Sequence, residues 1–211
     1  IAGREAFVYR YGPDLDLPHI WPLNTPSGRD LLVQHPDPYP HHRSFWWADT
    51  VKLDGGRDVS VYNGLYTGIK KSETVYEPPF KDYIRHVAFD RCEAKGDRAE
   101  IAERLVWEMD GGVPVLDEVR RTIVHSLGGG EYLLDITEEL ASRYGEVTFV
   151  SDEVHYAWPF LRLNTKFSGS NGGVLAADTG ARGEKETNLK VARWIDYSNA
   201  LDGAAEGVAI F

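Results

Sequence analysis

The sequence predicts an all-β fold, an antiparallel β-sandwich, and two observations support this class. Apolar and polar side chains alternate along residues 132–140, and this period of two is typical of a half-buried strand. Residues 99–109 and 115–125 are further strand candidates, and the Asp110-Gly111-Gly112 segment between them is typical of a hairpin turn. Residues 97–108 could be forced into a helical period, but the β-branched and aromatic end of this segment favours a strand. A helical segment at residues 97–104 is the main alternative.

Shorter segments complete the predicted meander. Residues 146–150 and 207–211 are strand-like, and we expect a single domain over residues 1–211. Because the last segment is strand-like up to its final residue, the possibility that the domain is truncated at its C-terminus stays open. Residues 36–40, with three prolines, are expected to be stiff and extended, whereas residues 167–189 are expected to be an irregular loop.

Composition excludes several classes of protein. The chain has 211 residues, 42% of them hydrophobic, which is enough for a packed core. Its net charge of -10 opposes binding to nucleic acid and to anionic lipid, and no apolar run approaches the about 20 residues of a membrane-spanning helix. Cys92 is the single cysteine, so no internal disulfide is possible. The localisation stays open between the cytoplasm and export with a signal peptide already removed, and the oligomeric state stays open as well.

The strongest candidate site is the segment PYPHHRSFWWAD, residues 38–49. His41 and His42 could transfer protons or bind a divalent metal ion, and Arg43 could stabilise negative charge. Trp46 and Trp47 could form a stacking platform for a sugar ring. Both histidines can face one cavity only if the chain turns there. The alternative is a hydrogen-bonded turn whose tryptophans fill the core.

Two further segments carry candidate residues. In SDEVHYAWPFLRL, residues 151–163, Glu153 and His155 share one face of an expected strand, which suits acid/base chemistry or metal binding. The alternative is an acidic strand start with a structural histidine. In KVARWIDYS, residues 190–198, Arg193 could clamp an acidic or hydroxyl-rich ligand, and Tyr197 joins the same substrate-binding set. The alternative there is an ordinary strand with one surface ion pair.

The familiar cofactor motifs are missing. The sequence has no GxGxxG, P-loop, HExxH, GxSxG or CxxC motif. No cofactor is therefore required by the sequence, and a divalent metal ion on His41 and His42 is the one cofactor that it leaves open.

Several segments carry a family resemblance. The segment HIWPLNTPSGRDLL, followed by PYPHHRSFWWADTV, resembles the bacterial family known as "methane oxygenase PmoA"-like, whose pattern is Pro-Leu-x-Thr-Pro-x-Gly and then His-Pro-His-His-Arg/Lys-Ser/Gly-Leu-Trp. WEMDGGVPVLDEVRR, SDEVHYAWPFLRL and GARGEKETNLKVARWIDYS resemble later segments of that family. The resemblance covers nearly the whole chain. It departs at Tyr39, where the family has His, and at the C-terminus, past which family members continue.

The resemblance implies a galactose-mutarotase-like β-supersandwich that acts on carbohydrate. The oxygenase name does not describe a chain without a spanning segment. We expect a carbohydrate-active enzyme, of lyase, dehydratase or epimerase type, whose acid/base chemistry is elimination, dehydration or epimerisation on a sugar or oligosaccharide. The first alternative is a non-catalytic carbohydrate-binding module, and the second is a structural β-sandwich. The expected site residues are His41, His42, Arg43, Glu153 and His155 for catalysis and Trp46, Trp47, Arg193 and Tyr197 for binding.

Overall fold

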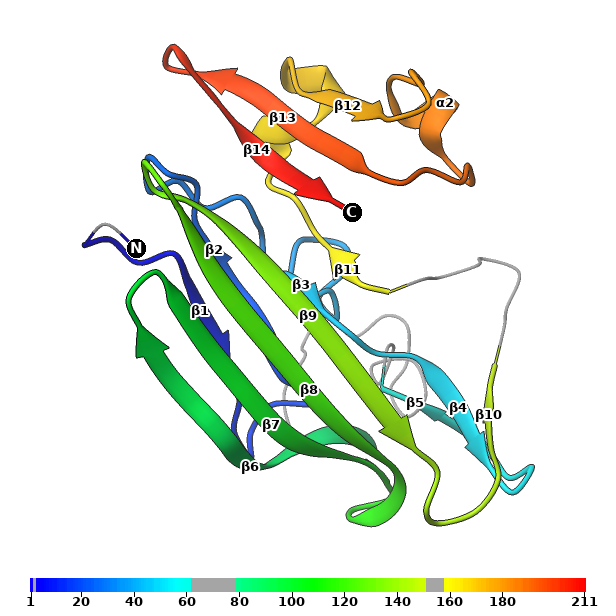
Figure 1. Cartoon of the computed structure of the whole chain (residues 1–211). Helices are drawn as coiled ribbons and strands as arrows, with labels where there is room; N and C mark the ends of the chain where they lie inside the picture. The colour runs from blue at the N-terminus through cyan, green and yellow to red at the C-terminus, as the bar shows by residue number, and fades with distance from the viewer. Residues whose placement is uncertain (2, 62–78, 151–157) are drawn as a thin grey trace.

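A computed structural model describes residues 1, 3–61, 79–150 and 158–211. Its largest sheet contains four long antiparallel strands in the order β6-β7-β8-β9, drawn in green in Figure 1. These strands are β6 (Asp82–Lys95), β7 (Arg98–Met109), β8 (Val113–Gly128) and β9 (Glu131–Ala141). Buried and exposed residues alternate along β7 and β8, as the sequence predicts.

A second antiparallel sheet faces the first in the order β1-β2-β3-β11. It contains β1 (Phe7–Arg10), β2 (His19–Leu23), β3 (Phe45–Trp46) and β11 (Phe160–Leu161). A small sheet of β10 (Val147–Phe149), β4 (Thr50–Leu53) and β5 (Asp58–Ser60) lies at one end. The described residues therefore form an all-β sandwich, and the predicted fold class is confirmed.

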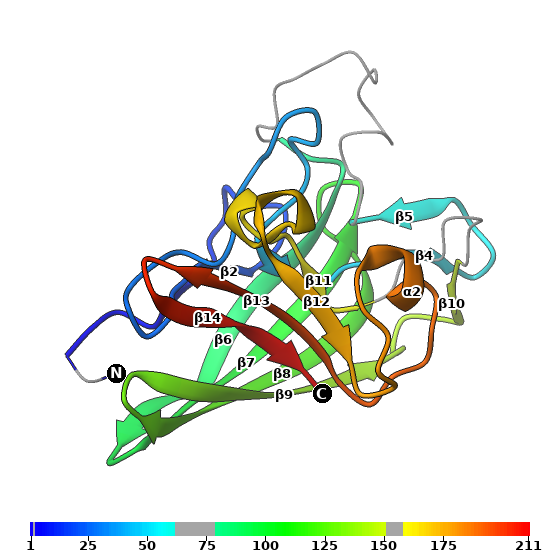
Figure 2. The same cartoon turned by 90° about the horizontal axis from the view of Figure 1, so that it is seen from above.

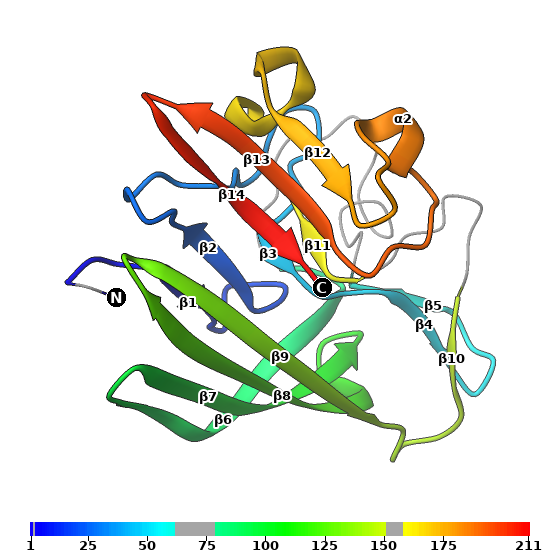
Figure 3. The same ribbon diagram turned by 45° about the horizontal axis from the view of Figure 1, so that its top comes forward.

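The C-terminal part of the chain forms one more sheet, in the order β12-β13-β14. It contains β12 (Val174–Ala177), β13 (Ile195–Leu201) and β14 (Ala204–Ile210), with the short helix α2 (Glu184–Thr187) beside it and 3-10 turns over Thr165–Phe167 and Gly169–Asn171. Figure 1 shows this sheet as a separate layer above the ends of β9 and β2, and in Figures 2 and 3 the same layer is turned toward the viewer. Leu201 and Val208 of this layer pack on the core cluster that includes Ile20 and Trp47.

Two apolar clusters form the core. The first gathers Leu17, Trp46, Leu105 and Trp107 with residues of β4, β5 and β8. The second, which contains Trp47, fills the space between β1, β2, β9 and the C-terminal layer. None of the helices among the described residues has the length and apolar character needed to cross a membrane.

Most local expectations agree with the structure. Residues 98–104 are strand rather than helix, with Asp97 in the turn before them. Residues 110–112 make the β7–β8 turn with positive φ at all three positions. The irregular loop expected at residues 167–189 is partly ordered, because β12 and α2 lie within it. The expected extended run at residues 36–40 is wrong, since the prolines sit in consecutive turns.

Candidate functional site

The segment between β2 and β3 folds back on itself and carries the candidate histidines. The Tyr39 N–H donates to the Pro36 carbonyl (2.6 Å), and the His42 N–H donates to the Tyr39 carbonyl (3.0 Å). The His35 N–H in turn donates to the His42 carbonyl (3.0 Å) and so closes the loop. This is the turn that both histidines need in order to lie on one side of the chain.

His41 and His42 form a compact aromatic group with Tyr39. Their ring centroids lie 4.5 Å apart at an interplanar angle of 73°. Tyr39 stacks on His42 with a centroid distance of 4.9 Å and meets His41 edge-on at 6.2 Å. Tyr39 is 43% exposed, His42 is half-buried and His41 is buried. The group therefore reaches the surface through Tyr39 and His42.

The sheet below this loop fixes its position. In the register of β2, β3 and β11, Trp46 pairs with both His19 and Phe160, and directly opposed residues share a face. The Trp46 and Phe160 rings stack with centroids 5.0 Å apart. The His42 ring lies against Trp46 with centroids 5.8 Å apart, so His42 rests on this row of aromatic rings.

Arg43 anchors the loop from below. Its guanidinium forms a buried ion pair with Asp16, which lies before β2, and its Nη1 donates to His35 Nε2 at 2.7 Å. The other ring nitrogen of His35 donates to the Pro40 carbonyl. Because Arg43 has no acceptor, this network assigns the proton of His35 to Nδ1. Arg43, expected to stabilise charge on a substrate, is only 3% exposed and instead positions the loop.

The environment keeps the two candidate histidines neutral. Burial lowers the pKa of His41 to about 4. Burial, together with His41 and Arg162, lowers the pKa of His42 to about 4. At neutral pH both imidazoles are therefore uncharged proton acceptors. This is the form that a general base or a metal ligand requires.

The expected tryptophan platform is wrong. Trp46 and Trp47 are 3% and 5% exposed and belong to the two core clusters, so neither ring is open to a sugar. Tyr39 is the exposed ring of the group instead, which the sequence argument did not select. The alternative of a turn whose tryptophans fill the core agrees with the structure.

Other expected binding residues lie on the C-terminal layer. Arg193 forms an ion pair with Asp178 (2.8 Å) with its side chain 88% exposed, as the alternative of a surface ion pair describes. Tyr197 is half-buried in β13, and burial raises its pKa. Glu153 and His155 lie outside the described residues, and their expected partnership with His41 and His42 stays a prediction.

The comparison with protein families covers the full length of the chain. Residues 1–211 match the model of a family described as a family of unknown function, DUF6807. The chain belongs to this family. No curated protein and no solved structure matches it significantly.

A metal site was one expectation for His41 and His42. Within the described ranges of this DUF6807 member, no group of three or more His, Cys, Asp or Glu side chains is placed to hold a metal ion. Two adjacent imidazoles alone are fewer than the three protein ligands of a typical catalytic zinc site. Metal binding by His41 and His42 stays a prediction that requires further ligands.

A second polar cluster, which the sequence argument missed, lies inside the sandwich of this DUF6807 member. The register places Glu103, Arg120 and Glu138 in one row across β7, β8 and β9. Arg120 is 1% exposed; its Nη2 lies 2.6 Å from Glu118, and its Nε lies 3.4 Å from Glu138. Burial raises the pKa of Glu138 to about 7. Glu103, Arg120 and Glu138 occupy the alternating strand positions at which the apolar, core-facing residues also lie. A charged residue at such a position is the sequence signal that could have predicted this buried cluster.

Tyr9 and His86 extend this buried cluster toward β1 and β6. The Tyr9 hydroxyl donates to Glu103, and His86 Nδ1 lies 2.9 Å from the other oxygen of the same carboxylate. Burial raises the pKa of both Tyr9 and Glu103. The cluster has acid/base groups, but its members pack between sheets, which makes it a structural network rather than an open site.

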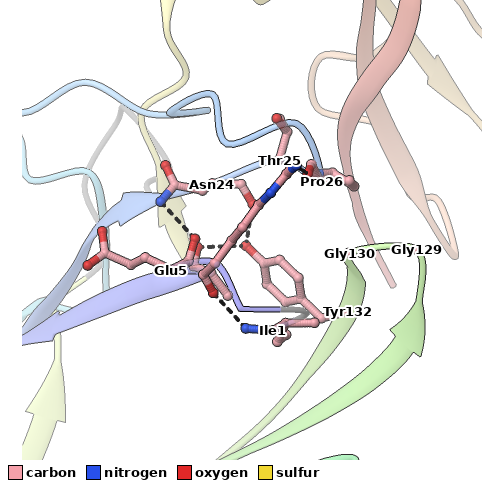
Figure 4. Close-up of a pocket in the computed structure, with 10 residues that line it drawn as sticks. Ile1, Glu5, Asn24, Thr25, Pro26, Gly129, Gly130 and Tyr132 are labelled. Atoms are coloured by element: carbon pink, nitrogen blue, oxygen red, sulfur yellow. Dashed lines mark hydrogen bonds between the residues drawn. The ribbon is translucent and has the colours of Figure 1, made fainter.

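A small pocket lies near the N-terminal end of β1. Figure 4 shows Tyr132 and Asn24 at its wall. The Tyr132 hydroxyl contacts the carbonyl oxygens of Asn24 (2.8 Å) and Ala6 (3.1 Å), and the Asn24 side chain donates to the Glu5 carbonyl (3.1 Å). These polar groups satisfy one another, and the lining contains no residue of the histidine loop. The loop at residues 34–44 is therefore the better candidate site.

Proposed function

We propose that the protein is a carbohydrate-active enzyme that performs acid/base chemistry, namely elimination, dehydration or epimerisation, on a sugar or oligosaccharide. The observation that supports this most directly is the pair of neutral imidazoles of His41 and His42, whose rings lie 4.5 Å apart on a loop that reaches the surface. A base that is unprotonated at working pH is what abstraction of a proton from carbon requires.

The surroundings of the pair suit this role. Asp16 and Arg43 hold the loop from the buried side, and the exposed His35 binds Arg43 from within the loop. Such support keeps catalytic groups in a fixed orientation. Tyr39 offers an exposed aromatic ring next to His42, and aromatic rings present an apolar face for packing. The resemblance of the segment around His41 and His42 to a carbohydrate-associated, galactose-mutarotase-like family supports a sugar as the ligand.

The test is turnover of a panel of oligosaccharides with the mass of each product measured. An unchanged mass indicates epimerisation, loss of water indicates dehydration, and shorter chains indicate a lyase or hydrolase. His42→Gln is expected to lower the rate about 10²–10⁴-fold and to keep the melting temperature. His125→Gln, which changes a histidine in β8, is the matched control and should keep the rate.

Two outcomes would replace this proposal. Binding of saccharides without any turnover would indicate the non-catalytic carbohydrate-binding module. Neither binding nor turnover over the panel would indicate a structural β-sandwich whose polar clusters stabilise the fold.

A further inference from the structure

Arg162 lies beside the histidine pair, and its guanidinium has no carboxylate partner among the residues that the structure describes. It directly follows β11, and its backbone is fixed on both sides: its N–H donates to the Ser44 carbonyl (2.7 Å), and its carbonyl accepts from the Val33 N–H (3.0 Å). Most arginines in the described part of this acidic chain pair with a carboxylate, whereas no ion pair of Arg162 occurs there. A half-buried arginine without a counter-ion is costly unless a ligand supplies one.

The groups around Arg162 form the exposed side of the candidate site. Its guanidinium carbon lies 5.6 Å from the centre of the Tyr39 ring, which in turn stacks on His42 at 4.9 Å. Asp16 is occupied by Arg43 on the buried side of the loop. Arg162 therefore places a positive charge beside the neutral rings of Tyr39 and His42, at the half-buried edge of the candidate site.

We propose that the saccharide bound here carries a carboxylate, as a uronic acid or a uronate oligosaccharide does, and that Arg162 pairs with that carboxylate. The inference rests on the proposed function and names its substrate class. Arginine matches a carboxylate through two parallel N–H···O bonds. An amide or hydroxyl of a neutral sugar would leave the charge of Arg162 uncompensated.

A carboxylate at this position would also serve the elimination reaction. When Arg162 neutralises the carboxylate, the C–H bond on the adjacent carbon becomes more acidic, because negative charge that develops there spreads onto the acid group. An imidazole of the histidine pair takes that proton, and the electron pair of the C–H bond forms a C=C bond. The C–O bond at the next carbon breaks, and the leaving oxygen takes a proton from solvent and departs as an alcohol. The products are an unsaturated acid and a free hydroxyl, and no oxidant or reductant is consumed.

The experiment compares binding of matched ligands to the full chain by isothermal titration. Glucuronate is set against glucose, galacturonate against galactose, and inorganic phosphate serves as a simple anion. Wild-type protein is expected to bind at least one uronate about 10-fold or more tightly than its neutral partner, the usual scale of a charge-assisted hydrogen bond. Arg162→Gln should abolish this preference. Arg162→Lys should keep part of it, because the charge remains but the paired N–H groups are lost.

Arg182→Gln is the matched control, because Arg182 is exposed and its side chain forms no ion pair among the described residues. This variant should keep the uronate preference, and equal melting temperatures of both Gln variants exclude misfolding. Equal binding of uronate and neutral sugar, with turnover of neutral oligosaccharides, overturns the uronate inference but leaves the proposed function. Phosphate binding as tight as uronate binding, lost in Arg162→Gln, also overturns it in favour of a phosphate ligand. If no saccharide is bound or turned over, both proposals fail.

Discussion

The rings of His41 and His42 lie 4.5 Å apart and nearly perpendicular, and burial keeps both neutral at physiological pH. An ordinary histidine titrates near pH 6.5, whereas the pKa of each of these two is lowered to about 4. The first prediction concerns the pH dependence of turnover. We expect kcat/KM to stay constant from pH 7 to about 5 and to fall as the pH approaches about 4. A rate that already halves near pH 6.5 would show that the base is an exposed histidine elsewhere.

The same shifts predict a loss of stability in acid. Because the folded state resists protonation of His41 and His42, their contribution to the free energy of unfolding is complete above about pH 6.5 and is lost as the pH falls through about 4. Burial also lowers the pKa of His19 to about 4, so His19→Gln is expected to reduce the slope of stability against pH between 6.5 and 4. Urea unfolding at several pH values measures this slope. An unchanged slope in His19→Gln would contradict the lowered pKa of His19 in the folded state.

The buried ion pair between Arg43 and Asp16 gives the third prediction. Asp16→Asn removes the carboxylate that pairs with the buried guanidinium of Arg43, and the loss of one partner of a buried ion pair costs about 3–5 kcal/mol of unfolding free energy. The matched control is Asp90→Asn, which breaks the exposed pair of Asp90 and Arg104 and should cost less than about 1 kcal/mol. Denaturant midpoints measure both. Equal losses in the two variants would show that the Arg43 pair does not anchor the loop.

The sequence predicts the part of this protein that local periodicity controls. The long hairpin of β7 and β8 follows from alternation and from the glycines at its turn, because both act over a few neighbouring residues. The turn at residues 36–42 could not be deduced in the same way. It depends on hydrogen bonds between Tyr39 and Pro36 and between His35 and His42, which proline content alone does not specify.

The roles of Arg43 and Trp46 also depend on distant residues. Asp16 lies 27 positions from Arg43, and Phe160 meets Trp46 across β3 and β11. The twelve-residue candidate segment, residues 38–49, therefore contains neither partner. A sequence pattern therefore locates the histidine pair, but it does not show which neighbours will be core and which will be exposed.

Trp46 gives the fourth prediction. Because its ring is 3% exposed and stacks on Phe160, Trp46→Ala opens a cavity and should lower the free energy of unfolding by about 3–5 kcal/mol. Val191→Ala, at a side chain that is 94% exposed, should change it by less than about 0.5 kcal/mol. Chemical denaturation measures both variants. A stable Trp46→Ala variant with specifically weakened saccharide binding would contradict this prediction and support Trp46 as a stacking platform for a sugar.

Glu138 gives the last prediction, because its environment opposes ionisation. Its side chain is 11% exposed, and burial, together with the nearby carboxylate of Glu118, raises its pKa to about 7 although Arg120 acts in the other direction. The folded state therefore favours the protonated acid more than the unfolded chain does. This contribution to stability is complete below about pH 4.5 and is lost as the pH rises through about 7, at a cost of up to about 3 kcal/mol. Its sign is opposite to that of His41 and His42.

Glu138→Gln removes the ionisation and keeps the shape of the side chain. We expect its free energy of unfolding to fall less than that of the wild type between pH 5 and 8. Glu139→Gln is the matched control, since Glu139 is the next residue on β9 and is exposed. Urea denaturation from pH 5 to 8 measures the difference. If Glu138→Gln and Glu139→Gln follow the wild-type curve equally, Glu138 ionises normally and the row of Glu103, Arg120 and Glu138 is a charged network that is fully compensated at neutral pH.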